Sequence, residues 1–123
     1  MFSEKFLEII GREGVVSIVS CDENGPHVVN TWNTYLVTKN NDTLMIPAYA
    51  MRKTEKKTIQ NNKVLLTVGS KEVIGHRGLG AGFLIEGTAK FISSGPDFDM
   101  MKNKFSFLTR VLEVTVTSMK QTL

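Results

Sequence analysis

The spacing of turn signals along the chain most restricts its possible folds. Asp22–Pro26 and Asn40–Asp42 are rich in residues that favour tight turns, and each lies between segments rich in β-branched residues. Such short connections join antiparallel strands, because parallel strands need a crossover of roughly a dozen residues or more. The sequence therefore predicts a mainly β fold, an antiparallel sheet closed into a small barrel with short flanking α-helices.

Strands are expected where β-branched and other apolar residues gather, at Val15–Cys21, His27–Val37, Thr43–Pro47, Lys63–Gly69, Gly82–Ser93 and Val111–Ser118. Helices are expected near the N-terminus, from Met51 to about Gln60, and after Gly95-Pro96. The glycine-rich stretch Gly75–Gly82 lacks the Gly-Lys-Ser/Thr of a phosphate loop and leads into a strand. We expect a mobile loop there.

Length and composition indicate one domain over residues 1–123. The chain is 41% hydrophobic and 22% charged, which is ordinary for a globular protein. No apolar run approaches the ~18 residues of a membrane span, and no basic leader precedes an apolar stretch. A single cysteine, Cys21, fits a reducing compartment, so we expect a cytoplasmic protein without a membrane partner. The net charge of +3 permits an anionic ligand without requiring a polyanion.

The segment His27–Val37 has an unusual distribution of polar residues for a strand. Hydrogen-bonding side chains occupy the middle of both faces and surround Trp32, the only tryptophan of the chain. Two interpretations are open. The centre of the strand is exposed and Trp32 is ordinary packing, or the strand is one wall of a ligand site, where amides and hydroxyls bind polar edges and an aromatic side chain covers an apolar ring.

The segment Met51–Lys57 places cations where a helix is expected to begin. A helix N-terminus carries partial positive charge and prefers acidic residues, so these cations oppose the helix dipole. A bound anion reverses that penalty, and the free N–H groups, the Thr54 hydroxyl and the Lys53 ammonium would together form a phosphate site. The alternative is a solvated, lysine-rich helix face.

Other chemistry has little support in the sequence. His27 and His76 have no metal-type spacing with Cys21 or with paired carboxylates, so we expect no metal site. No catalytic triad can be assembled, and we assign no catalytic residue.

Several segments resemble the small FMN-binding proteins of the pyridoxamine-5′-phosphate-oxidase-like split-barrel group. The similarity runs nearly end to end. Its most specific part is Asn30-Thr31-Trp32-Asn33, followed about twenty residues later by Lys53-Thr54-Glu55. The other segments that carry it are Glu13-Gly14-Val15-Val16, Gly25-Pro26-His27-Val28-Val29, Met51-Arg52, Gly82-Phe83-Leu84-Ile85 and Gln121-Thr122-Leu123.

The resemblance implies a six-stranded Greek-key split β-barrel that forms a homodimer, with one FMN per subunit at the dimer interface. By the same resemblance, Trp32 lies against the isoalloxazine, Tyr35 is nearby, and the partner subunit covers the flavin with Leu123 and an aromatic residue of the last helix, here Phe107. The remaining cofactor-binding residues fall in two segments. They are Asn30, Thr31 and Asn33 in the first, and Pro47, Ala48, Tyr49, Ala50, Met51, Arg52, Lys53 and Thr54 in the second.

Within the second segment, the resemblance assigns distinct tasks. Lys53 and Thr54, with Asn30 and Thr31, hold the phosphate and ribityl chain, and Pro47–Met51 meets the polar edge of the ring largely through its backbone. Two departures from the family pattern concern the ring. Phe107 stands where the family has tryptophan, and Tyr49-Ala50 replaces a Gly-Gly pair that would allow close backbone approach.

Three functions follow from these observations. The leading one is an FMN-binding electron carrier, which leaves room for a redox partner protein. The second is a flavin-dependent oxidase or flavin reductase of the same group. The third is a small barrel that binds single-stranded nucleic acid through basic and aromatic residues, which we do not favour because most phenylalanines lie on core-like stripes.

Overall fold

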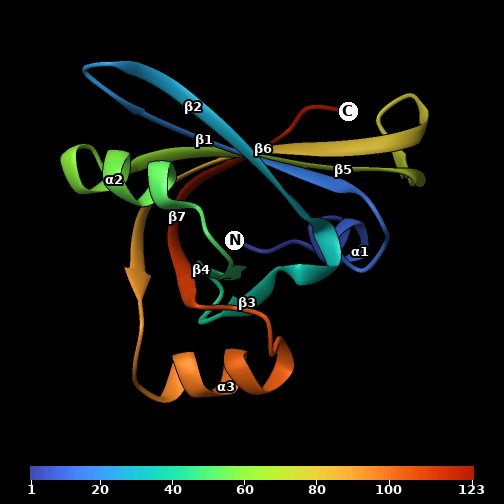
Figure 1. Ribbon diagram of the computed structural model, residues 1–123. Coiled ribbons are helices and arrows are strands. Elements are labelled where there is room, and N and C mark those ends of the chain that lie inside the picture. Colours follow the sequence, from blue (N-terminus) through green and yellow to red (C-terminus); the bar gives the residue numbers. More distant parts are fainter.

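One curved antiparallel sheet organises the protein, and the computed structural model describes all residues from 1 to 123 (Figure 1). Its seven strands lie in the order β2-β1-β5-β6-β7-β4-β3. The strands are β1 (Val15–Asp22), β2 (Gly25–Trp32), β3 (Val37–Lys39), β4 (Thr43–Ala48), β5 (Lys63–Gly75), β6 (Gly78–Ile92) and β7 (Arg110–Gln121). The predicted mainly β, antiparallel fold is confirmed. The sheet is not closed, because β2 and β3 are its two edges, and the barrel is therefore split between them.

The helices cover different parts of the sheet. They are α1 (Glu4–Ile10), α2 (Arg52–Gln60) and α3 (Pro96–Lys104). Helix α1 packs on β5 and β6, α2 lies under the β1–β2 hairpin and also contacts β6, and α3 lies beneath β4 and β7 (Figure 1). Local sequence explains where two of them start. The Ser3 hydroxyl accepts the Phe6 N–H at the start of α1, and Pro96 opens α3 after Gly95 at a φ of 103°.

The core lies on the inner face of the sheet, where alternate residues of the strands point. Its fully buried members include Phe6, Ile18, Leu66, Ile85 and Leu112. A second, smaller cluster lies under α3 and consists of Met45, Met101, Leu108 and Val111. Helix α1 contributes Phe6, Ile9 and Ile10 to the main core, and α3 contributes Met101 to the smaller cluster.

The predicted strand His27–Val37 is divided, which makes the strand number seven where the resemblance implied six. The break is a single turn of 3-10 helix, η1 (Asn33–Tyr35). The buried Asn33 side chain causes it, because its amide donates to the Ile9 carbonyl at 3.2 Å and the Gly69 carbonyl at 2.8 Å. The Asn33 N–H also donates to the Gly14 carbonyl at 2.9 Å. These bonds turn the chain inward, so that it leaves one edge of the sheet and returns at the other.

The glycine-rich stretch Gly75–Gly82 is a second correction. It is not a loop but the tip of the long β5–β6 hairpin, with Gly75 paired to Gly78 and only His76 and Arg77 between them. The φ of 124° at Gly78 is one that glycine adopts at no steric cost. The two longest strands, β5 and β6, thus remain paired up to this turn. None of the three helices, α1, α2 and α3, has the length and the apolar composition of a membrane-spanning segment.

Candidate functional site

The start of α2 is the most unusual backbone in the protein. Ala50 and Met51 both have left-handed backbone angles, with φ of 64° and 51°. Met51 is the N-cap residue and supplies no side-chain hydrogen bond to the helix. The first N–H groups of a helix have no partner within the helix, so the tip of α2 presents donors. Arg52 and Lys53 are exposed in the same turn and add positive charge to that tip.

The Thr54 hydroxyl is a further feature of this tip that bears on oxyanion binding. Thr54 is fully buried in the first turn of α2, and its Oγ1 has no hydrogen-bond partner. A buried hydroxyl without a partner costs about 1–3 kcal/mol, which a ligand oxygen would recover. The residues at the tip therefore fit a phosphate group. Thr31, only 5% exposed, is the one residue of the predicted Asn30-Thr31 pair that faces the interior.

Lys53 also borders a small hollow between α2 and the β1–β2 hairpin. The hollow has a volume of about 290 Å³, and its lining includes Pro26 and His27 of β2 together with Lys56 and Lys57. Lys57 is not free, because its Nζ donates to Asp22 at 2.7 Å and to the Gly25 carbonyl at 3.0 Å. That bond holds the pKa of Asp22 below its ordinary value. Lys53 and Lys56 remain as the exposed cations beside β2.

The aromatic residues of the predicted site gather at the other end of β2. Trp32 is 47% exposed and shares a hollow of about 340 Å³ with Glu13, Thr34 and Tyr35. The Tyr35 ring lies 5.6 Å from the Phe107 ring, centroid to centroid. Phe107 follows α3 and is not part of it, so the expected place on the last helix is wrong, although its ring is exposed as a ligand cover requires. Trp32, Tyr35 and Phe107 thus form one aromatic edge, in which Trp32 and Phe107 are exposed and Tyr35 is half-buried.

The two asparagines of the predicted site differ in accessibility. Asn30 lies on the outer face of β2, and its amide nitrogen is 3.3 Å from both the Val16 carbonyl and the Ser17 hydroxyl. Asn33 is buried, and its amide nitrogen is used to fold η1, as described above. Its Oδ1 has no partner. Asn33 therefore supports the position of Trp32 and Tyr35 from within the fold.

The segment Pro47–Met51 leads from β4 to the tip of α2. Pro47 and Ala48 pair with Val111 and Arg110 of β7, and the Ala48 carbonyl accepts from both the N–H and the hydroxyl of Thr109. Beyond this point the chain leaves the sheet, and Tyr49 and Ala50 are exposed. The first two residues of the segment are thus held by pairing with β7, and its last two form the left-handed turn.

Leu123 lies apart from the other predicted residues of its own chain. It is 62% exposed and borders a hollow at the tip of the β5–β6 hairpin. The last residue approaches Gly75 so closely that an added Cβ would lie 2.7 Å from the Leu123 carbonyl oxygen. Figure 1 shows the C-terminus beside β6, on the other side of the molecule from α2.

Arg110, the first residue of β7, is a part of the site that sequence reasoning missed. It is 6% exposed, donates to Glu55 of α2 at 2.9 Å, and also donates to the Ala50 carbonyl. The only signal in the sequence is a charged residue directly before the apolar alternation of β7. That signal does not indicate which partner the arginine has.

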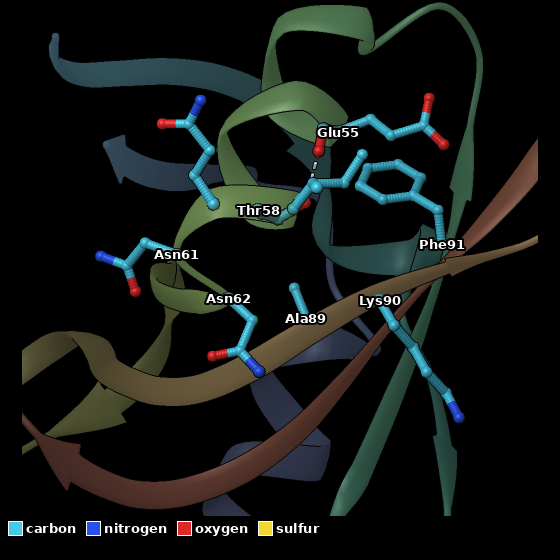
Figure 2. A pocket seen from close by; sticks show the side chains of 9 residues that line it. Glu55, Thr58, Asn61, Asn62, Ala89, Lys90 and Phe91 are labelled. Carbon is cyan, nitrogen blue, oxygen red and sulfur yellow. Dashed lines mark hydrogen bonds between the residues drawn. The ribbon is translucent and has the colours of Figure 1, made fainter. Parts of the chain in front are cut away.

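The largest hollow of the protein lies beside the site, between the C-terminal half of α2 and β6 (Figure 2). Its volume is about 680 Å³, and none of the predicted cofactor-binding residues lines it. No group of three or more histidine, cysteine or acidic residues could hold a metal ion. The helix tip and the aromatic edge therefore remain the candidate site.

Solved structures place the architecture in the class of split barrels. The chain is similar to HupZ of Group A Streptococcus, with a TM-score of 0.81 and 14% identity over 98% of this chain and 94% of that one. It is also similar to an FMN-binding protein from Syntrophomonas wolfei, with a TM-score of 0.75 and 16% identity over 98% of this chain and 85% of that one. At these identities, the similarity concerns the fold.

Within that class, the chain belongs to the pyridoxamine 5′-phosphate oxidase family, whose model matches residues 2–123. A curated relative, the FMN-binding protein of Nitratidesulfovibrio vulgaris, is 42% identical over 123 residues, which is all of both chains. The family resemblance predicted from the sequence motifs is thereby confirmed.

Proposed function

We propose that this protein binds FMN without a covalent bond and acts as a small electron carrier. The observation that carries the proposal is the first turn of α2, which holds exposed cations, N–H groups without a partner in the helix, and the buried, unpartnered Thr54 hydroxyl. A phosphate monoester supplies both the acceptor atoms and the negative charge that these groups lack. The 42% identical relative is named an FMN-binding protein, which supports the flavin monoester as the ligand.

Each part of the site has a task in this proposal. Lys53, Thr54 and the first N–H groups of α2 would bind the phosphate, with Arg52 adding charge, and Asn30 and Thr31 would bind the ribityl chain. The ring would lie against Trp32 beside Tyr35, and the backbone of Pro47–Met51 would meet its polar edge.

Bound FMN supplies the redox chemistry, because the isoalloxazine takes up and returns electrons. The protein places the ring and controls its surroundings. Positive charge from Arg52 and Lys53 favours the state of FMN that carries more negative charge. An apolar cover of Trp32 and Phe107 excludes water from the flavin ring and disfavours negative charge on it. The balance of these two effects sets the potential of the carrier.

A homodimer completes the proposed site. Val28, Val19 and Leu65 are directly opposite one another on β2, β1 and β5, and they form an apolar row on the outer face of the sheet. Asn30 and Trp32 lie on the same face of β2. A second copy packed on this face would bury the row. It would also bring the partner's Leu123 to the aromatic edge, which Leu123 does not reach within its own chain.

An oxidase or flavin reductase is the second candidate. The hollow beside Trp32 favours it, because its space of about 340 Å³ and the Glu13 carboxylate would admit a small substrate next to the ring. We favour the carrier because no histidine, cysteine or lysine lines this hollow, and the only side-chain partner of Glu13 within it is the Thr34 hydroxyl at 3.5 Å. A redox partner protein would then meet the aromatic edge.

The first experiment measures flavin binding directly. Purified protein should be yellow, should release FMN on denaturation, and the apoprotein should bind FMN more tightly than riboflavin in a fluorescence titration. A colourless protein that binds neither flavin, but binds a labelled single-stranded oligonucleotide, would contradict the proposal. Turnover of NADH with oxygen, above the rate of free FMN, would identify the enzyme and exclude the simple carrier.

A matched pair of lysine variants locates the phosphate. Lys53→Gln should weaken FMN binding about tenfold or more and change riboflavin binding by less than about threefold, because riboflavin has no phosphate. Lys56→Gln removes an equally exposed charge one turn further along α2 and is the control. Equal losses of both flavins in Lys53→Gln would show that Lys53 does not contact phosphate.

A further inference from the structure

Arg110 is a buried cation at the junction of three elements. It begins β7, and its side chain reaches the turn before α2, the helix itself and the aromatic ring of Phe91 on β6. The guanidinium carbon is 5.1 Å from the centre of the Phe91 ring, a cation–π distance. One terminal nitrogen donates to Glu55 and the other to the Ala50 carbonyl. A charge is rarely buried without such specific partners.

The bond to the Ala50 carbonyl acts on the strained part of the backbone. Ala50 and Met51 are consecutive non-glycine residues in the left-handed region, which costs roughly 1–2 kcal/mol for each residue. Such a conformation persists only where surrounding structure holds it. Arg110 holds the peptide between these two residues by its carbonyl oxygen, and so fixes the direction in which α2 begins.

The bond to Glu55 acts on the charge at the helix tip. Glu55 is the acidic residue of the first turn of α2, where its carboxylate would repel an incoming phosphate. Its Oε1 instead accepts from Arg110 at 2.9 Å and from Arg52 at 3.2 Å. Figure 2 shows Glu55 on α2 and Phe91 on β6 side by side at the rim of the large hollow. Arg110 donates to Glu55 and lies 5.1 Å from the centre of the Phe91 ring, so the Glu55 carboxylate has a cationic partner within the fold.

We propose that Arg110 is a positioning residue of the phosphate site. We assign it no direct contact with the phosphate, because its side chain is buried and both terminal nitrogens bond within the chain, to Glu55 and to Ala50, while Nε has no partner. It holds the left-handed turn that aims the free N–H groups of α2, and it removes the repulsion of Glu55. The inference rests on the proposed function, because it names the part of this chain that prepares the FMN site.

The test compares FMN with riboflavin, because a purely structural role of Arg110 would affect both flavins alike. In Arg110→Met, the preference for FMN over riboflavin should fall about tenfold, with riboflavin affinity within about threefold of the wild type. Arg110→Lys keeps the charge but lacks the planar fork whose two nitrogens reach Glu55 and Ala50, and its preference should fall about threefold. Val111→Ala, a cavity variant at the next buried position, is the control for stability and should keep the wild-type preference.

A second substitution separates the two actions of Arg110. Glycine adopts positive φ freely, so Ala50→Gly in the Arg110→Met background should recover part of the lost preference for FMN. The same Ala50→Gly change in the wild type should alter the preference by less than about twofold, because the turn is already held there.

The outcomes for the two proposals are distinguishable. Wild-type protein that binds neither flavin contradicts the proposed function. Wild-type protein that prefers FMN, combined with an unchanged preference in both Arg110→Met and Arg110→Lys, contradicts only the role of Arg110. If Arg110→Met does not fold, the Arg110→Lys measurement alone decides.

Discussion

At the start of α2, alanine and methionine occupy backbone angles that glycine adopts far more easily. The φ of Ala50 is 64° and that of Met51 is 51°. Ala50→Gly should stabilise the protein by about 0.5–1 kcal/mol, because relief of the left-handed strain exceeds the entropy that glycine gains in the unfolded chain. Urea unfolding measures the change. Ala48→Gly, in the regular end of β4, should instead destabilise, and a loss of stability in both variants would contradict the strain at Ala50.

Trp32 is the residue from which we expect the largest contribution to binding of the flavin ring. Trp32→Ala should weaken FMN and riboflavin equally, by about tenfold or more, because base-sized aromatic stacking is worth about 1–3 kcal/mol. Trp32→Phe retains a ring and should recover most of the affinity. Fluorescence titration of both flavins measures the effect. Unchanged flavin affinity in Trp32→Ala would show that Trp32 does not contact the flavin and is an ordinary exposed aromatic residue.

Among the elements, α2 is attached to the β1–β2 hairpin by one ion pair with little solvent exposure. Lys57 donates to Asp22 at 2.7 Å, and this bond holds the pKa of Asp22 below its ordinary value. A lowered pKa in the folded state gives stability above pH ~4, the ordinary aspartate range, and that stability disappears as pH falls through the folded-state pKa.

Asp22→Asn should therefore be less stable than the wild type at pH 7, and the difference should narrow below pH ~4. Urea unfolding at a series of pH values measures it. Glu72→Gln, which breaks the exposed pair with Arg12, is the control and should change stability little at any pH. If the difference in unfolding free energy between Asp22→Asn and the wild type stays constant down to pH ~2, the ion pair does not contribute to the stability of the fold.

The elements that are determined by residues close together in the sequence could be predicted. The β-branched segments and the turn at Asp22–Pro26 depend on neighbouring residues, and so do the cations that mark the tip of α2. The break at Asn33 was not predictable, because the carbonyls that bend the chain belong to Ile9 and Gly69, far away along the sequence. Arg110 was missed for the same reason, since its partners Ala50 and Glu55 are about sixty residues earlier. Long-range polar contacts of single side chains leave no periodic pattern to read.

The hairpin at Gly75–Gly82 shows a different limit. Glycine-rich sequence is compatible both with a loop and with a tight turn between strands, and the pairing of Ile74 with Leu79 decides between them. The same ambiguity applied to Trp32, whose exposure could not be read from an alternating pattern that is polar on both faces.

For the whole molecule, the proposed site requires two copies of the chain. The apolar row of Val28, Val19 and Leu65 lies on the outer sheet face, and Val28 is 56% exposed. A lysine at Val28 would place an unpaired charge in the proposed interface, at a cost of several kcal/mol. Val28→Lys should therefore be monomeric in light scattering at concentrations where the wild type is a dimer. Ile59→Lys, at an exposed position of α2 outside the apolar row, should remain dimeric.

Flavin binding should change together with the oligomeric state, because in the proposed dimer the partner's Leu123 covers the flavin. We expect Val28→Lys to bind both flavins more weakly and to show greater quenching of flavin fluorescence by solvent-borne iodide. Deletion of Leu123 should reproduce the greater quenching while the dimer stays intact, since the residue is exposed at the end of the chain and lies outside the apolar row. A monomeric wild type with tight FMN binding would contradict the shared site, because the helix tip and Trp32 of a single chain would then suffice.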